Sequence, residues 1–231
     1  QVINMADRFL VIDGSSLIHR AFFALPPLMN RQGLHTGAVY GFCNMLLKLL
    51  EEIQPKYIAV AFDKSRKTFR TEMFANYKGT RKPTPSELSE QFPLTMKVLD
   101  ALNIVSLELD NYEADDIIGT VAKEAEAAGL EPYIITGDKD ELQLATDVTK
   151  IIFTKKGVSE FDIYDKQAMI DKYGLTPEQF IDLKGLMGDK SDNIPGIPGV
   201  GEKGATKLLM EYGSVENIIA NVDNLKPAGI K

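Results

Sequence analysis

Hydrophobic and polar positions change period repeatedly along the chain. Short, nearly continuous apolar runs, typical of buried parallel strands, lie at 8–13, 57–63 and 131–136, with weaker candidates at 104–109 and 149–153. Helical periods separate these runs, at 37–54, 88–102 and 113–128. This alternation predicts an α/β fold with a mostly parallel central sheet flanked by helices. Any site is then expected beyond the carboxyl ends of the strands.

Two regions break the alternation. Residues 64–90 are basic, contain two prolines and lack a sustained apolar face, so we expect a mobile loop or loosely held helices there. After residue 164 the period is purely helical, over 165–173, 176–187, 201–212 and 215–220. We therefore predict a core domain over residues 5–163, which includes the basic segment at 64–90, and a small helical subdomain over residues 164–231.

The composition is ordinary for a globular protein, with 44% hydrophobic and 26% charged residues in a chain of 231. No apolar run approaches the roughly 20 residues of a membrane span, and no secretory pattern opens the chain. We therefore expect a cytoplasmic protein without a membrane partner. The single cysteine, Cys43, excludes an internal disulfide and a CxxC metal site.

The net charge of −7 argues at first against a nucleic-acid partner, but the charges are unevenly distributed. Residues 64–82 contain seven basic side chains and a single acid. Phe69, Phe74 and Tyr77 interleave with these cations, a combination that can follow a phosphate backbone while stacking exposed bases. A solvated surface is the alternative. Because Asp63 directly precedes the segment, we favour nucleic-acid binding next to the acidic residues described below.

Acidic residues gather where the predicted strands end and where helices begin. They come from five separate segments: Asp13, Asp63, Glu113, Asp115, Asp116, Asp138, Asp140, Asp189 and Asp192. Glu113 and Asp116 share a helix face because they are three residues apart, and Asp189 and Asp192 repeat that spacing. Each acid taken alone is more simply explained as a helix cap or as a partner of the helix dipole. Together, nine anions would repel one another strongly unless cations neutralised them.

A ligand set made of carboxylates favours hard divalent ions such as Mg²⁺ or Mn²⁺, and the lack of clustered histidine or cysteine argues against zinc. Two such ions can activate a water molecule and stabilise the leaving oxygen of a phosphodiester. No protein nucleophile is then needed, so we interpret His19 and His35 as structural or surface residues rather than as a general base. The acids therefore predict two-metal hydrolysis of a phosphodiester.

Residues 199–204 spell GxGxxG, the glycine pattern of dinucleotide-binding loops. A proline-rich connector precedes them, where such a loop needs a strand, and helices follow. We interpret the segment instead as a helix-hairpin-helix, in which Gly199 and Gly201 present backbone N–H groups to a DNA phosphate beside Lys203. A plain turn between helices is the alternative.

Several short segments occur in an order that is specific to one family: VIDGSSLIHRAF, AVYGF, VAFD, FR, NYKGTRKPTP, NYEADDIIG, ITGDKD, GLMGDKSDNIPG and GVGEK. Through them the chain resembles the 5′ nucleases, the 5′-3′ exonucleases and flap endonucleases that include the N-terminal domain of bacterial DNA polymerase I. Two positions depart from that pattern. Glu141 follows GDKD where the family more often has an apolar residue, and Gly204 stands where threonine is common. Neither departure removes a ligand.

The resemblance implies a PIN-like core, a helical arch over residues 64–90 and a helix-hairpin-helix over residues 185–212 that often holds K⁺. It divides the nine acids between two metal positions, with Asp13, Asp63, Glu113, Asp115 and Asp116 at the first, and Asp138, Asp140, Asp189 and Asp192 at the second. It assigns phosphate contacts to Arg20, Arg70, Lys78 and Arg81. Lys78 and Arg81 are expected to orient the reacting phosphate, and Asp116 to be essential for catalysis.

We therefore expect a structure-specific 5′ nuclease that hydrolyses DNA at 5′ flaps and 5′ ends, in primer removal and repair at the bacterial nucleoid. We expect a monomer, and a full-length protein that continues beyond Lys231 into a polymerase domain. Two alternatives stay open: a non-catalytic protein that binds DNA junctions through the same fold, and a metal-dependent ribonuclease on a similar core. Substrate preference separates the three.

Overall fold

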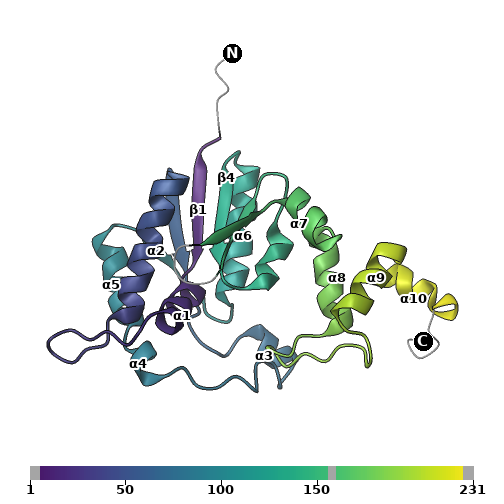
Figure 1. The fold of residues 1–231 in the computed structure, drawn as a ribbon, viewed down its shortest axis with the longest axis horizontal. Helices are drawn as coiled ribbons and strands as arrows, with labels where there is room; N and C mark the ends of the chain where they lie inside the picture. Colours follow the sequence, from purple (N-terminus) through teal and green to yellow (C-terminus); the bar gives the residue numbers. More distant parts are fainter. Residues whose placement is uncertain (1–5, 156–159, 226–231) are drawn as a thin grey trace, which may run out of the picture. The chain divides into compact units, whose positions relative to one another are not determined.

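The computed structural model describes residues 6–155 and 160–225 (Figure 1). These residues form two compact units. The core unit holds the chain up to Phe69 together with Pro83–Asp165, and the helical unit holds Arg70–Lys82 together with the chain from Lys166 onward. The middle of the basic segment is therefore grouped with the helices, although the sequence suggested the core. The domain boundaries proposed from the sequence stay a prediction.

The core unit is built on one sheet of six strands, in the order β3-β2-β1-β4-β5-β6. Their bounds are β1 Arg8–Asp13, β2 Tyr57–Ala61, β3 Val105–Leu107, β4 Glu131–Thr136, β5 Lys150–Thr154 and β6 Phe161–Tyr164. Neighbouring strands run parallel except β5 and β6. The strands predicted from the apolar runs are confirmed, and β6 is an additional edge strand. Because β2, β1 and β4 are parallel neighbours, their carboxyl ends meet at one edge of the sheet.

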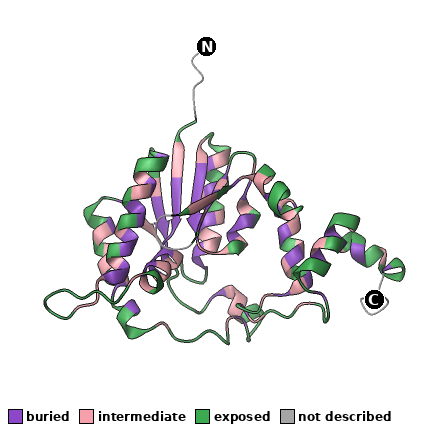
Figure 2. Cartoon of the chain, viewed as in Figure 1, coloured by how far each residue is buried: buried purple, intermediate pink, exposed green. Residues whose placement is uncertain are grey.

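Helices cover both faces of this sheet, and buried residues concentrate on the strands and on the inner helix faces (Figure 2). The helix bounds are α1 Gly14–Ala24, α2 Gly37–Ile53, α4 Ser86–Ser89, α5 Phe92–Ala101 and α6 Ala114–Ala127. Leu17 of α1 and Phe42 of α2 belong to the same buried cluster as Leu10 and Ile12 of β1. Helix α6 contacts β1 and β4, and its buried Ile118 lies outside that cluster. Alternate residues of β1 thus serve two separate hydrophobic layers.

Helix α1 begins directly after β1, without an intervening turn. Asp13 is both the last residue of β1 and the N-cap of α1. Gly14 permits this junction, because a Cβ atom at that position would lie 2.4 Å from the ring of Phe62. The side chain of Asp13 is therefore held at the carboxyl edge of the sheet by the strand before it and the helix after it.

The helical unit contains α7 Lys166–Tyr173, α8 Pro177–Met187, α9 Glu202–Tyr212 and α10 Val215–Ala220, which confirms the helices predicted after residue 164. Thr176 caps α8, since its hydroxyl accepts a hydrogen bond from the Gln179 N–H at 3.3 Å. In the connection from α8 to α9, a Cβ atom on Gly196 would lie 2.2 Å from the carbonyl carbon of Met187. This backbone contact requires glycine and keeps the proline-rich connector compact.

The basic segment between residues 64 and 90 contains two short helices, α3 Phe69–Met73 and α4. The remainder is turns and irregular backbone. The mobility expected for this segment stays a prediction. Across residues 6–155 and 160–225, no helix combines the length and the apolar character needed to cross a membrane.

Candidate metal centre and nucleic-acid interface

Asp13 is the most enclosed of the predicted metal residues, with 4% of its surface exposed. Its carboxylate accepts hydrogen bonds from the Ser16 N–H at 2.9 Å and from the Thr136 hydroxyl at 3.0 Å. Both donors are neutral, so they orient the carboxylate without cancelling its charge. Burial, followed by the negative charges of Asp115 and Asp63, raises the pKa of Asp13 to about 8.

Asp63, just after β2, lies beside the start of α6, where Glu113 is the N-cap. The Asp63 carboxylate accepts a hydrogen bond from the Ala114 N–H at 3.0 Å, at the first turn of the helix. Glu113 is the N-cap of α6 and is buried, and its own N–H donates to the Asp116 carboxylate at 3.0 Å. The helix start therefore presents its acids at the sheet edge where β2 ends. The i, i+3 pairing of Glu113 and Asp116 predicted from the sequence is confirmed.

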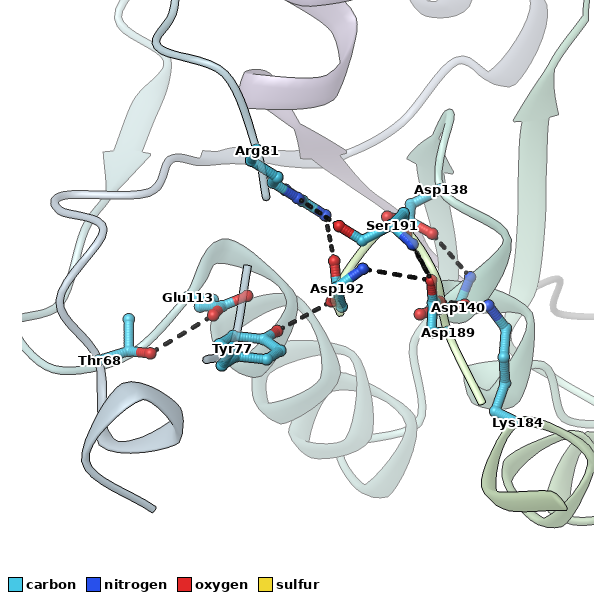
Figure 3. A network of polar contacts seen from close by, with 10 residues as sticks. All are labelled: Thr68, Tyr77, Arg81, Glu113, Asp138, Asp140, Lys184, Asp189, Ser191 and Asp192. Atoms are coloured by element: carbon cyan, nitrogen blue, oxygen red, sulfur yellow. Dashed lines mark hydrogen bonds and ion pairs between the residues drawn. The ribbon is translucent and has the colours of Figure 1, made fainter. Parts of the chain in front are cut away.

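Asp138 and Asp140 follow β4 and begin the 3₁₀ helix η1, Lys139–Leu144. The Asp138 carboxylate accepts from the Asp140 N–H at 2.9 Å (Figure 3). The Asp138 N–H donates to the Thr136 hydroxyl at 2.9 Å. Gly137 donates its N–H to the Ser16 hydroxyl at 2.9 Å. Ser16 and Thr136 thus bind the ends of β1 and β4 together. The sequence analysis did not single out either residue. Their hydroxyl side chains, next to the acids of VID and GDKD, could have indicated partners for those carboxylates.

Within the core unit, the structure therefore brings acids from four chain segments to the same edge of the sheet. Their charges interact, since Asp115 and Asp63 both raise the pKa of Asp13. The donor set is entirely carboxylate oxygen, which suits a hard divalent cation, and such a cation would relieve the repulsion. In the described part of the chain, no group of three or more His, Cys, Asp or Glu side chains is arranged to hold a metal ion as it stands. Binding would then require carboxylates to turn toward the ion.

The remaining two acids lie in the helical unit, in the loop that follows α8. Lys184 lies 2.7 Å from Asp189, whose carboxylate also accepts from the Ser191 N–H and hydroxyl at 2.7 and 2.6 Å. Burial opposes ionisation, but Lys184 and Ser191 prevail and lower the pKa of Asp189 below its ordinary value. Asp189 is thus an ionised carboxylate with a cationic neighbour, unlike Asp13. The assignment of Asp189 and Asp192 to the second metal position stays a prediction.

Asp192 holds the basic segment against this loop. Its carboxylate accepts from the Tyr77 hydroxyl at 3.0 Å and pairs with the Arg81 guanidinium at 2.5 Å (Figure 3). Its backbone carbonyl accepts from the Lys78 N–H at 2.9 Å. Tyr77 is 9% exposed, so its ring is covered in this structure rather than presented for base stacking. The DNA contacts predicted for Tyr77, Lys78 and Arg81 stay predictions.

The other candidate DNA contacts differ in exposure. Arg20, on α1, is half-buried, and burial lowers the pKa of its guanidinium. Arg70 lies in α3 and is also half-buried. Gly199, Gly201 and Lys203 are exposed immediately before and within the first turn of α9. Gly199 has a φ of 83°, a backbone conformation that favours glycine and supports a tight hairpin between the helices.

Both histidines have structural contacts. His19 Nδ1 lies 2.8 Å from the carbonyl oxygen of Ser15, and its ring packs edge-on against Phe92. His35 Nδ1 lies 2.5 Å from the Glu90 carboxylate. That neither histidine acts as a general base stays a prediction.

Comparisons with known proteins cover nearly the whole length of the chain. A family model described as the 5′-3′ exonuclease N-terminal resolvase-like domain matches residues 8–174, and a second, described as the 5′-3′ exonuclease C-terminal SAM fold, matches residues 175–231. DNA polymerase I of Bacillus caldotenax is 55% identical over 98% of this chain, and that of Bacillus subtilis is 53% identical over 97%. The chain spans 26% of the length of each relative.

Solved structures show the same fold. T5 5′-exonuclease with bound zinc ions is 26% identical, with a TM-score of 0.77 over 96% of this chain and 82% of that one. The T5 D15 flap endonuclease in a pseudo-enzyme-product complex with DNA and metal ions is 25% identical, with a TM-score of 0.76 over 96% of this chain and 82% of that one. The catalytic core of Rad2, at 19% identity and a TM-score of 0.64 over 96% of this chain and 67% of that one, supports the fold alone.

Proposed function

The chain belongs to the 5′-3′ exonuclease family, and on this basis we propose that it is a structure-specific nuclease that hydrolyses DNA at 5′ flaps and 5′ ends with divalent metal ions. One observation carries the proposal. Acids from separate segments gather at the carboxyl edge of the parallel sheet, where Asp13 is buried and the charges of Asp115 and Asp63 lie close enough to raise its pKa. A site of this kind requires cations to hold its charge.

The residues that would hold the ions are Asp13, Asp63, Glu113, Asp115 and Asp116 at one position, and Asp138, Asp140, Asp189 and Asp192 at the other. When bound, the ions stabilise the attacking and departing oxygens of the phosphodiester. We infer Mg²⁺ or Mn²⁺, because the donor set lacks the nitrogen and sulfur ligands that favour zinc. Ser16 and Thr136 orient the Asp13 carboxylate, and Ser15 accepts a hydrogen bond from the Asp63 N–H at 3.2 Å.

The basic segment supports binding of the substrate phosphates. Lys78 and Arg81 are proposed to orient the reacting phosphate, while Arg20 and Arg70 contact its neighbours. In the structure Arg81 is paired with Asp192 and its side chain is 44% exposed, so it can exchange this partner for a phosphate. The exposed hairpin at Gly199, with Lys203, is proposed to bind the duplex backbone and K⁺.

The wider setting is inferred from the relatives. Because they are named DNA polymerase I and extend well beyond this chain, we infer that a polymerase domain follows in the full-length protein. We propose that the protein acts in primer removal and DNA repair. We also propose that it is a monomer located in the cytoplasm.

A cleavage assay tests this proposal against its alternatives. A 5′-flap DNA labelled at its 5′ end is incubated with Mg²⁺, with EDTA, and with the Asp116→Asn variant. The amide oxygen of the asparagine can still accept the hydrogen bond from the Glu113 N–H, so the helix start is kept while one metal-binding charge is lost. We expect cleavage at the flap junction with Mg²⁺, none with EDTA, and a rate reduced by about 100-fold in the variant.

Two results would reject the proposal. Binding of the flap without cleavage, at every Mg²⁺ concentration, indicates a junction-binding protein. Equal cleavage of single-stranded RNA without a flap indicates a ribonuclease.

A further inference from the structure

Glu141 is the least exposed acid of the core unit. Only 2% of its surface is accessible, and neither of its carboxylate oxygens has a hydrogen-bond donor among the described residues. A buried acid without a donor is costly, and an apolar side chain would fill the same space at lower cost. Packing alone therefore does not explain glutamate at this position.

The carboxylate of Glu141 is buried beside predicted metal residues. It lies in η1, directly after Asp140, and its carboxylate is within hydrogen-bonding range of Asp115. Burial, followed by the charges of Asp115, Asp13 and Asp138, raises the pKa of Glu141 well above its ordinary value. Ionised carboxylates cannot donate to one another. In the ionised form that a metal ion would bind, Glu141 therefore meets three like charges and no donor.

We propose that Glu141 is an additional oxygen ligand of the divalent-metal centre, placed beside Asp115 to bind the same ion. This inference rests on the proposed metal-dependent function. A hard divalent ion takes six or more oxygen ligands and would give the Glu141 oxygens the partner that the protein does not supply. The cost of burying the acid in the metal-free protein is then offset when the ion binds.

Mn²⁺ binding to the whole chain, measured by calorimetry, tests this inference without reference to activity. Glu141→Gln keeps the size of the side chain and removes its charge. Glu124→Gln removes the same charge from an exposed position on α6 and is the matched control. We expect the Mn²⁺ dissociation constant to rise by about 10-fold in Glu141→Gln and to stay at the wild-type value in Glu124→Gln.

Thermal unfolding provides a second readout. Without metal, Glu141→Gln should melt at a higher temperature than the wild type, because the amide does not meet the burial and like-charge repulsion that make the buried acid costly. The rise in melting temperature on adding Mn²⁺ should be smaller than in the wild type. Glu141→Leu places an apolar side chain at the buried position, so this variant should be stable. Its affinity for Mn²⁺ should fall as in Glu141→Gln.

The possible failures are distinguishable. Wild-type Mn²⁺ affinity in both Glu141 variants, combined with higher metal-free stability, would overturn the inference and leave Glu141 a buried acid without a role in metal binding. Wild-type protein that binds no Mn²⁺ would overturn the proposed function itself, and the inference with it.

Discussion

Replacing Asp13 with asparagine is expected to slow cleavage of a 5′-flap DNA by about 100-fold or more, while raising the stability of the metal-free protein. Asparagine keeps an oxygen for the Ser16 N–H, so the junction between β1 and α1 is preserved. It removes a buried acid whose ionised form Asp115 and Asp63 repel. Loss of the carboxylate should weaken metal binding, and it should also remove the free-energy cost of burying an acid that stays protonated in the metal-free protein.

Single-turnover cleavage at saturating DNA and a series of Mg²⁺ concentrations measures the first effect, and thermal unfolding in EDTA measures the second. Asp100→Asn, an exposed substitution on α5, is the matched control and should change neither quantity. A variant at Asp13 that cleaves at the wild-type rate would remove this residue from the metal centre. A variant that loses activity together with its stability would indicate a structural role only.

The stability of the metal-free protein should fall as the pH rises from about 4 to about 8. The pKa of Asp13 is 3.8 in an unperturbed side chain and about 8 in the folded protein. Below pH 4 the group is protonated in both states, and its favourable contribution is fully present. As the pH rises, the unfolded chain releases the proton while the folded chain retains it, so this contribution is lost progressively until the folded group also ionises.

Each pH unit within this window should lower the free energy of unfolding by up to about 1.4 kcal/mol. Urea unfolding in EDTA at pH 5, 6.5 and 8 measures the slope, and the Asp13→Asn variant subtracts the contribution of other groups. Mn²⁺ should flatten the slope, because a bound cation favours the ionised carboxylate. Equal slopes in the wild type and in Asp13→Asn would contradict the raised pKa. Asp189 has the opposite effect. Because its pKa is lowered in the folded protein, its contribution to the stability of the protein is lost only in strong acid.

The buried parallel strands were predictable because both faces of each are apolar, which leaves an unbroken hydrophobic run. β6 was not, because it is a four-residue antiparallel edge strand whose sequence FDIY includes an acid. Helix α1 was missed because it starts at Gly14 with no turn after β1, and the close approach of Gly14 to Phe62 involves residues far apart in the sequence.

The gathering of acids in the core unit followed from the topology, since parallel strands end at the same edge. The environment of individual side chains did not. Tyr77 was expected to stack on bases, yet its hydroxyl bonds Asp192, 115 residues later. Glu141 stood out only as a departure from the family pattern, because no local pattern shows that a polar residue of a short helix is buried against Asp115.

The most direct test of the metal centre is anomalous diffraction from a crystal of the protein containing Mn²⁺. We predict manganese peaks at the carboxyl edge of the sheet, with oxygens of Asp13 and Asp115 at roughly 2.1 Å. Manganese bound only away from these carboxylates, in a protein that cleaves flap DNA under the same conditions, would contradict the account.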